Sequence, residues 1–200
     1  MKSRLKKVLI PLFLGFIGLC YFLFNNQFWT HLNTDNFETL AEYEGENISG
    51  LWGRQILVHK KFVPYLNKIE DLAVKNNIEL TINQGYRSNK HPLLGAIVKP
   101  SKVSNHLAGF AIDFNIKHEG TTYSSKKLKR AQLVNLPKDL QNFIKDIRQE
   151  KGLRWGGDFN TQDPVHIDFP INIRNKKTWS NYARLSAIDY ENASFKYQFW

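Results

Sequence analysis

Cysteine is almost absent from this sequence, because Cys20 is the single cysteine in 200 residues. It lies in the N-terminal segment, so the chain after residue 24 contains no thiol. A disulfide framework is therefore excluded for that part of the chain. A zinc site built from cysteine thiolates is excluded there for the same reason.

Repeats, low-complexity tracts and nucleic-acid-binding motifs are also absent, which excludes solenoids and disordered tails. The net charge is +10, and four of the basic residues belong to the N-terminal segment. The other basic residues are dispersed among acidic ones, a pattern that does not indicate nucleic-acid binding and that suits an anionic cell wall or lipid headgroups. With 42% hydrophobic residues, the chain can build one domain with a sizeable core.

A basic start and a long apolar run distinguish residues 1–24 from the rest. The seventeen residues from Val8 to Phe24 carry no charge, and as a helix they would reach ~25 Å, the short end of what crosses a bilayer. No A-x-A-like cleavage site follows, so the segment is predicted to be an uncleaved, single-pass signal anchor in a bacterial cytoplasmic membrane. The positive-inside rule places the rest of the chain in the periplasm or the cell-wall zone.

Two alternatives exist for this N-terminal segment. A buried core helix is disfavoured, because Pro11, Gly15 and Gly18 are poor choices for a soluble helix. Lipid attachment at Cys20 is the other alternative. Leu19 argues against it, since bacterial lipoprotein signals resemble one another in having a small residue at that position.

The remaining chain divides by composition and periodicity. Residues 25–53 are rich in Asn, Thr, Glu and Gly and are predicted to form a tether and lead-in. The domain is predicted over 54–170, and a C-terminal extension over 171–200 packs on it or trails it. A loop is predicted over 89–103. Helices are predicted at 61–76, 137–151 and 178–185, and strands at 78–88, 109–116 and from 165 onward. Helices and short strands without regular βαβ alternation indicate an α+β fold.

A histidine and an aspartate flank a predicted turn in the segment SNHLAGFAIDFNI, residues 104–116. His106 precedes the strand and Asp113 lies within it, so the two meet if the chain turns between them. Catalytic zinc takes three protein ligands and leaves a fourth position to water. His166, on the last predicted strand, would supply the third ligand. Asp163, three residues earlier, would then act as the base that accepts a proton from the attacking water.

Ordinary structural roles explain most single residues of this kind. A lone histidine is more often a packed or solvated residue than a metal ligand, and His31, His59, His91 and His118 are assigned to that class. Asp113 differs from them, because apolar residues flank it on a strand that is predicted to be buried. A charge in such a place is costly unless it is paired or binds metal.

A longer pattern, SxHxxGxAxD, is formed by Ser104, His106, Gly109, Ala111 and Asp113. Together with GYRS upstream and WGGDF and DPVH downstream, it resembles the LAS zinc metallopeptidases. These bacterial and phage enzymes include D-alanyl-D-alanine carboxypeptidases and dipeptidases and L-alanyl-D-glutamate endopeptidases. The resemblance covers about residues 58–170. It implies the α+β fold shared with hedgehog signalling proteins, a small antiparallel sheet with helices packed against it.

The resemblance also implies a role for individual residues. Asp163 matches the family's catalytic carboxylate. Arg87 falls where the family has an arginine that holds the substrate carbonyl or its developing oxyanion, and Ser104 falls where a hydroxyl helps to bind substrate. The three zinc ligands of the family are matched by His106, Asp113 and His166.

Asp168 is a rival for the role of base. It follows His166 by two residues, so strand alternation would place both side chains on the same face. The alternative role for Asp168 is to orient that ligand from behind the metal site.

The function implied is zinc-dependent hydrolysis of peptide bonds in the stem peptides of peptidoglycan. An L-alanyl-D-glutamate endopeptidase is preferred over a D-alanyl-D-alanine carboxypeptidase, because Asp163 and WGGDF look more like that branch. The alternative of another class is a non-catalytic wall-binding module, against which the complete set of ligands, carboxylate and arginine argues. A purely structural zinc would be expected to have a fourth His or Cys ligand.

Overall fold

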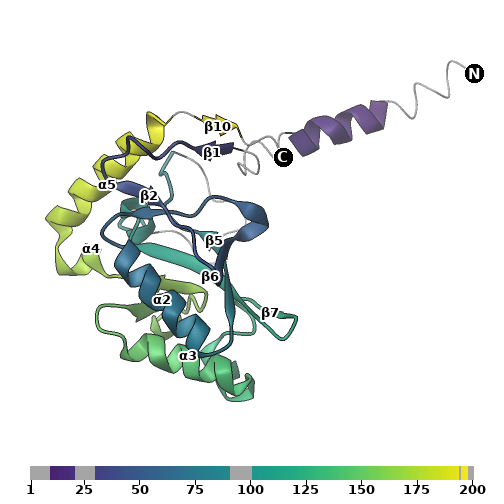
Figure 1. The fold of residues 1–200 in the computed structure, drawn as a ribbon, viewed down its shortest axis with the longest axis vertical. Coiled ribbons are helices and arrows are strands. Elements are labelled where there is room, and N and C mark those ends of the chain that lie inside the picture. Colours follow the sequence, from purple (N-terminus) through teal and green to yellow (C-terminus); the bar gives the residue numbers. More distant parts are fainter. Residues whose placement is uncertain (1–9, 21–29, 91–100, 194, 198–200) are drawn as a thin grey trace, which may run out of the picture.

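The computed structural model describes residues 10–20, 30–90, 101–193 and 195–197. Its body is built on a six-stranded sheet with the strand order β3, β5, β6, β9, β8, in which β7 also pairs with β6. Apart from the parallel pair β3 and β5, neighbouring strands are antiparallel. The predicted α+β fold with a small antiparallel sheet is therefore confirmed (Figure 1). The strands of this sheet are β3 (Ile48–Gly50), β5 (Glu79–Gln84), β6 (Ala111–His118), β7 (Thr121–Tyr123), β8 (Arg154–Trp155) and β9 (His166–Asp168).

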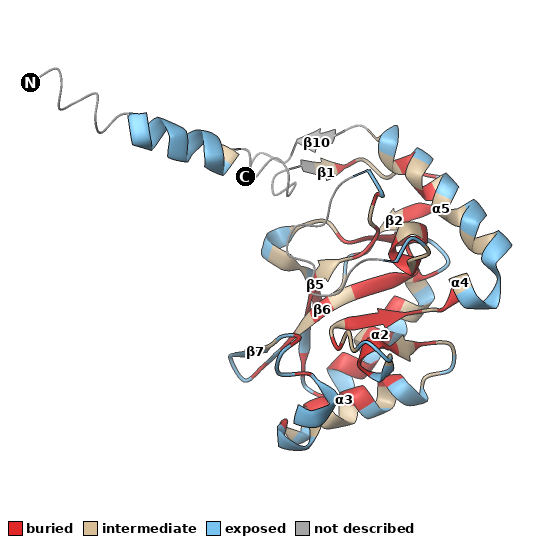
Figure 2. Cartoon of the chain, turned by 180° about the vertical axis from the view of Figure 1, so that it is seen from behind, coloured by how far each residue is buried: buried red, intermediate tan, exposed pale blue. Residues whose placement is uncertain are grey.

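Two amphipathic helices, α2 (Val63–Lys75) and α3 (Lys138–Gln149), pack with the sheet around one hydrophobic core. Each begins near a proline, where the missing backbone N–H costs nothing. The buried residues of both helices recur at helical spacing and belong to the same core as those of β5 and β6. Figure 2 shows the buried residues along these elements in red. Those of the helices are Leu66, Ile69, Leu72 and Ala73 of α2 and Leu140, Phe143, Ile144 and Ile147 of α3.

Strand β6 carries the predicted alternation. Ile112, Phe114 and Ile116 are fully buried in the core, whereas Asp113 and Asn115 are half-buried on the opposite face. The apolar set fixes which face of β6 points into the core, because a slip of one residue would move every side chain to the other face. Asp113 is thereby held on the face of the sheet that points away from α2 and α3.

The stretch 25–53, predicted to be a tether and lead-in, contains strands in the part that the structure describes. From Thr30 onward this stretch contributes three strands to the folded body, β1 (Thr30–Leu32), β2 (Leu40–Glu42) and β3. β1 pairs with β10 (Phe195–Tyr197), β2 pairs with β4 (Leu57–His59), and β3 extends the main sheet. The polar composition gave no sign of these strands, because each is only three residues long and has one buried apolar side chain among its described residues.

The C-terminal extension packs on the domain through α4 (Ile171–Arg174) and α5 (Lys176–Glu191). Near the end of α5, the buried Asp189 carboxylate accepts hydrogen bonds from the backbone N–H groups of Glu38, Thr39 and Leu40 and from the Thr39 hydroxyl. Burial raises the pKa of Asp189, but these hydrogen bonds outweigh it and lower the pKa below its ordinary value. This carboxylate therefore fastens α5 to the start of β2.

The N-terminal segment is helical over residues 10–20, and apolar side chains such as Leu12, Phe13 and Phe16 are exposed on it. Among the described residues, no helix combines the length and apolar character needed to cross a membrane. Residues 1–9 and 21–24 of the predicted anchor lie outside the described residues, as do residues 91–100 of the predicted loop.

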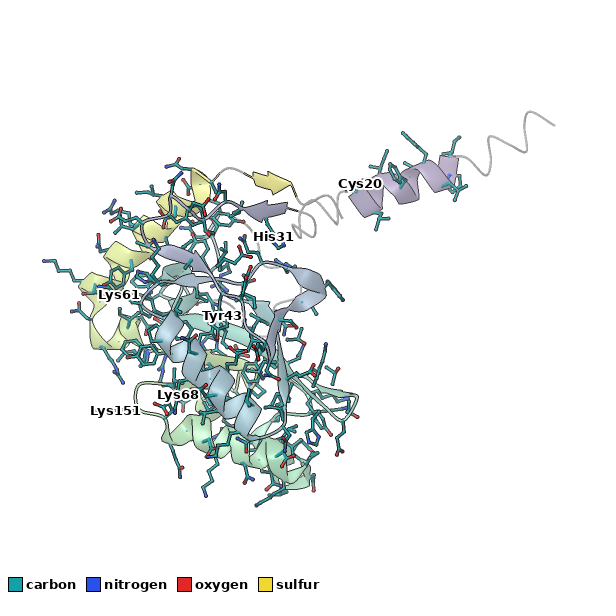
Figure 3. All side chains as sticks on the ribbon, in the orientation of Figure 1. Cys20, His31, Tyr43, Lys61, Lys68 and Lys151 are labelled. Carbon is teal, nitrogen blue, oxygen red and sulfur yellow. The ribbon has the colours of Figure 1, made fainter. Side chains whose placement is uncertain are left out.

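Charged side chains lie on the outer surface of the body. Lys61, Lys68 and Lys151 are exposed, and Figure 3 shows them on the outer side of the ribbon. Other surface cations form ion pairs with nearby acids, including Lys75 with Asp146 at 2.9 Å.

Candidate metal centre

The first candidate ligand, His106, lies on the 3₁₀ turn η2 (Asn105–Ala108). Ser104 caps the turn, because its hydroxyl accepts the backbone N–H of His106. Gly109 ends it in the left-handed region with φ of 73°. A Cβ at Gly109 would lie 2.6 Å from the backbone nitrogen of His59, so only glycine fits there. The tight reversal leads the chain directly into β6.

A hydrogen bond to the backbone fixes the orientation of the His106 ring. Its Nδ1 lies 2.7 Å from the carbonyl oxygen of Gly85, just after β5. A carbonyl oxygen can only accept, so Nδ1 donates its hydrogen there, and Nε2 is the ring nitrogen that is available to a metal. A neighbouring acceptor of this kind is what sets the tautomer of a metal-binding histidine. Nε2 faces Asp113 and His166.

The other two candidate ligands face each other across the sheet. In the antiparallel pairing of β6 with β9, Asp113 is opposite His166. The Oδ1 atom of Asp113 lies 2.9 Å from Nδ1 of His166 and 3.2 Å from Nε2 of His106. The two imidazole nitrogens are 3.2 Å apart. The predicted meeting of the three side chains is therefore what the structure shows.

The spacing of these three atoms fits a zinc ion. Zinc bonds of ~2.0–2.1 Å at tetrahedral angles place neighbouring ligand atoms about 3.3 Å apart. The three observed separations lie between 2.9 and 3.2 Å. Two neutral imidazoles and one carboxylate also form a donor set that catalytic zinc uses. Within the part of the chain that the structure describes, these three residues are the group with metal-ligand geometry.

The three side chains lie close enough to shift the pKa values of Asp113 and His166. Burial raises the pKa of Asp113, but the adjacent His106 and His166 outweigh it and hold this pKa far below its ordinary value. Burial lowers the pKa of His166, but Asp113 and Asp168 outweigh it and raise this pKa to about 10. In the absence of metal, a proton on His166 therefore supplies the positive charge at the centre.

The predicted base, Asp163, is held on a short turn before His166. Its backbone N–H donates to the carbonyl of Gly156 at 2.9 Å, and its own carbonyl accepts the N–H of His166 at 3.0 Å. The indole of Trp155 donates to the carbonyl of Pro164 at 2.8 Å. A Cβ at Gly156 would lie 2.3 Å from the Asp163 carbonyl oxygen, so this close approach requires glycine. Trp155 is thus a buried core residue that supports the turn.

The two candidate bases differ in basicity. Burial and the charge of Asp113 raise the pKa of Asp163 above its ordinary value. Burial also raises the pKa of Asp168, but the neighbouring His166 and Arg154 outweigh it and lower the pKa to about 2. Asp168 is only 2% exposed and receives both donors of Arg154 at 2.9 and 2.6 Å. These surroundings favour Asp163 as the proton acceptor.

Arg87 and Ser104 border the centre, and their roles toward a substrate are still predictions. The backbone N–H of Arg87 donates to the carbonyl of His106 at 3.1 Å. Burial lowers the pKa of the half-buried Arg87 guanidinium, and the charge of Asp113 opposes this shift. The Ser104 carbonyl accepts the indole N–H of Trp179 at 3.1 Å, which ties the segment to α5.

The remaining histidines do not join the centre. His59 is buried between the rings of Phe110 and Tyr182, and burial lowers its pKa to about 4. His118 lies 3.1 Å from a carboxylate oxygen of Asp139. His31 contacts Gly53 and Glu42, and His91 lies outside the described residues.

Two groups next to the metal centre, the carbonyl of Gly85 and the side chain of Asn105, were not predicted from the sequence. The carbonyl of Gly85 belongs to the backbone and leaves no residue-type signal, although GYRS directly overlaps this position. The side chain of Asn105, adjacent to His106, contacts Asp168 at 2.6 Å. Its position inside SxHxxGxAxD is one that the pattern leaves unspecified.

Comparison with known proteins shows that the segment carrying the centre is similar to a peptidase family. Residues 98–169 match a family model described as D-alanyl-D-alanine carboxypeptidase. The match covers less than half of the chain and includes His106, Asp113, Asp163 and His166 but not Arg87. It confirms the resemblance to the LAS zinc peptidases. A search of curated proteins gave no match.

Zinc binding at this centre is expected to release the proton of His166. The imidazole is protonated below a pKa of about 10 in the metal-free protein, and a ligand nitrogen must be unprotonated. Zinc affinity should therefore rise about tenfold per pH unit between about pH 6 and 8. Competition with a chromophoric chelator at each pH measures this slope.

A matched pair of histidine variants controls the measurement. His106→Ala should lose the zinc, whereas His118→Ala should keep about one zinc per chain, since His118 lies outside the centre. An affinity that does not change with pH, or zinc retained by His106→Ala, would contradict the assignment.

Proposed function

We propose that this chain is a zinc-dependent peptidase that hydrolyses peptide bonds in peptidoglycan stem peptides. The observation that carries the proposal is the convergence of His106, Asp113 and His166 with ligand atoms 2.9 to 3.2 Å apart. The match of the surrounding segment to a peptidase family supports it. Zinc bound there would polarise the scissile carbonyl and make water acidic enough to attack near neutral pH.

Asp163 is the general base in this proposal. Its raised pKa makes it a better proton acceptor than an ordinary surface carboxylate. It takes a proton from the attacking water and passes it to the nitrogen of the leaving amine. The backbone hydrogen bonds of Asp163 to Gly156 and His166, and the indole hydrogen bond of Trp155 to Pro164, hold the turn that carries this carboxylate.

Arg87 is assigned to the developing negative charge on the substrate. Its guanidinium presents several N–H donors in one plane, and such donors stabilise an oxyanion best where water is partly excluded. The guanidinium is half-buried and within the electrostatic reach of Asp113. Ser104, which caps the turn that carries His106, is assigned to substrate binding through its hydroxyl.

Two bonds of the stem peptide are candidates. The L-alanyl-D-glutamate bond is the first, because Asp163 and WGGDF resemble the endopeptidase branch. The terminal D-alanyl-D-alanine bond is the second, because the matching family model is described as D-alanyl-D-alanine carboxypeptidase. A non-catalytic wall-binding module is disfavoured, since such a module needs neither a base of raised pKa nor three converging metal ligands.

Digestion of purified muropeptides with the zinc-loaded chain tests the function. Mass spectrometry should show either loss of one terminal alanine or release of the peptide that follows L-alanine, and the two products differ in mass. Intact muropeptides after prolonged digestion would contradict peptidase activity.

Asp163→Asn is the matched control for the same digestion. It preserves the shape of the side chain and leaves the three ligands untouched, so the variant should still bind zinc. Turnover should fall about 10²- to 10⁴-fold, the usual contribution of a general base. A variant that keeps wild-type turnover would move the role of base to another residue.

We propose in addition that residues 1–24 anchor the chain in a bacterial cytoplasmic membrane, with the peptidase outside. The basic start, the uncharged run from Val8 to Phe24 and the exposed apolar side chains of helix 10–20 support this. The full chain should sediment with membranes and resist extraction by high salt. A variant that lacks residues 1–24 should be soluble, and sedimentation of both forms would contradict the anchor.

A further inference from the structure

A buried polar network lies behind the metal centre, on the side of His166 away from Asp113. Its central residue is Asp168, the last residue of β9. The side chain is 2% exposed, yet it is charged and contacts three other polar side chains. A buried carboxylate is costly unless such partners compensate it. The proposed function assigns no chemical step to any member of the network.

The first contact of Asp168 is with a candidate ligand. Its Oδ2 atom lies 3.6 Å from Nε2 of His166, an ion-pair distance that is longer than a hydrogen bond. The other ring nitrogen, Nδ1, faces Asp113 and His106. When Nδ1 is committed to a metal, Nε2 must carry the hydrogen. The Asp168 carboxylate is therefore placed to receive it and to set the rotation of the ring.

Arg154 fixes Asp168 from the neighbouring strand. Its guanidinium donates through Nε and one terminal nitrogen, at 2.9 and 2.6 Å, to the two carboxylate oxygens. This two-point contact defines the plane of the carboxylate. The same guanidinium lies 4.9 Å from the centre of the Phe159 ring, which packs 5.7 Å from the ring of His166. Arg154 thus supports the imidazole of His166 through the Asp168 carboxylate and through the Phe159 ring.

Asn105 extends the network to the second histidine-bearing segment. Its side-chain NH₂ donates to Asp168 at 2.6 Å and to the side-chain oxygen of Asn172 at 3.0 Å. Its side-chain oxygen accepts the backbone N–H of Asn172 at 3.1 Å. Asn105 directly precedes His106 on η2. The network therefore connects η2 to β9, the two elements that carry the two histidines.

We propose that Asp168 is a positioning residue of the metal centre, and that Asp168 and Asn105 together hold His166 and His106 in ligating orientation. The proposal rests on the proposed zinc centre, and it assigns the network no contact with substrate. It predicts a specific loss of metal affinity when the network is broken, beyond any general loosening of the fold.

Asp168→Asn in the full-length chain tests this directly, because it removes the charge and preserves the size. Zinc affinity, measured by chelator competition, should fall about 10- to 100-fold, as expected for loss of a group that orients a metal ligand. The visible spectrum of the cobalt(II)-substituted variant should also shift, because the ring of His166 changes its orientation toward the ion. Neither readout involves peptide cleavage, so failure of this proposal and failure of the peptidase activity are distinguishable.

Asp189→Asn is the matched control. Asp189 is also a buried carboxylate that accepts several hydrogen bonds, but its partners are Thr39, Leu40 and Glu38, at the start of β2. This variant should lower the midpoint of thermal unfolding and leave zinc affinity and the cobalt spectrum unchanged. An equal loss of zinc affinity in the two variants would reduce the effect to general destabilisation and overturn the proposal.

Asn105→Ala tests the connection between the two segments. It should weaken zinc binding by itself, and the double variant with Asp168→Asn should be little worse than the more severe single variant, because both changes remove the same contact. If Asp168→Asn does not fold, Arg154→Gln replaces it with the same expected losses. Wild-type zinc affinity in the Asp168 or Arg154 variant, or fully additive losses in the double variant, would overturn the proposal.

Discussion

The pairing of Asp113 with His166 across β6 and β9 is the constraint on which the site depends. The register is fixed from the opposite face of the strand, where Ile112 and Phe114 are fully buried. A slip of one residue would expose these apolar side chains and turn the carboxylate into the core, so the core selects the register that brings the two ligands together. Burial of the apolar side chains on one face of β6 thereby fixes the position of the Asp113 carboxylate on the other face.

The position of the third candidate ligand, His106, depends on a different feature, the reversal of the chain at Gly109. Gly109 adopts a left-handed conformation there and its carbonyl accepts the backbone N–H of His59 at 2.9 Å, after which the chain enters β6. His106 is then oriented by a backbone carbonyl on one side, and its free nitrogen faces Asp113 on the other. All three ligands are therefore oriented before a metal binds. Against the effect of burial, Asp113 and Asp168 raise the pKa of His166 to about 10, so without metal a proton on His166 offsets part of the negative charge of the two carboxylates.

Sequence periodicity was sufficient for the elements that build the core. The helices α2 and α3 and strand β6 bury their predicted faces, since each is long enough to show its period. The three-residue strands β2 and β3 are too short to show one, so the polar composition of 25–53 predicts a tether and lead-in instead of strands. Spacing and side-chain chemistry suggested the three candidate ligands, and the resemblance to the LAS zinc peptidases supplied the complete set. The Asn105 to Asp168 contact joins residues 63 positions apart, and no local pattern encodes it.

X-ray absorption at the zinc K-edge, on the full-length chain loaded with one equivalent of zinc, examines the coordination most directly. Zinc bound by His106, Asp113 and His166 should give a four-coordinate shell at ~2.0–2.2 Å. The shell should contain two imidazoles and a carboxylate oxygen and be completed by one further light atom. Six-coordinate, all-oxygen zinc without imidazole scattering would show that the ion does not bind between His106, Asp113 and His166, and would contradict the proposed zinc site.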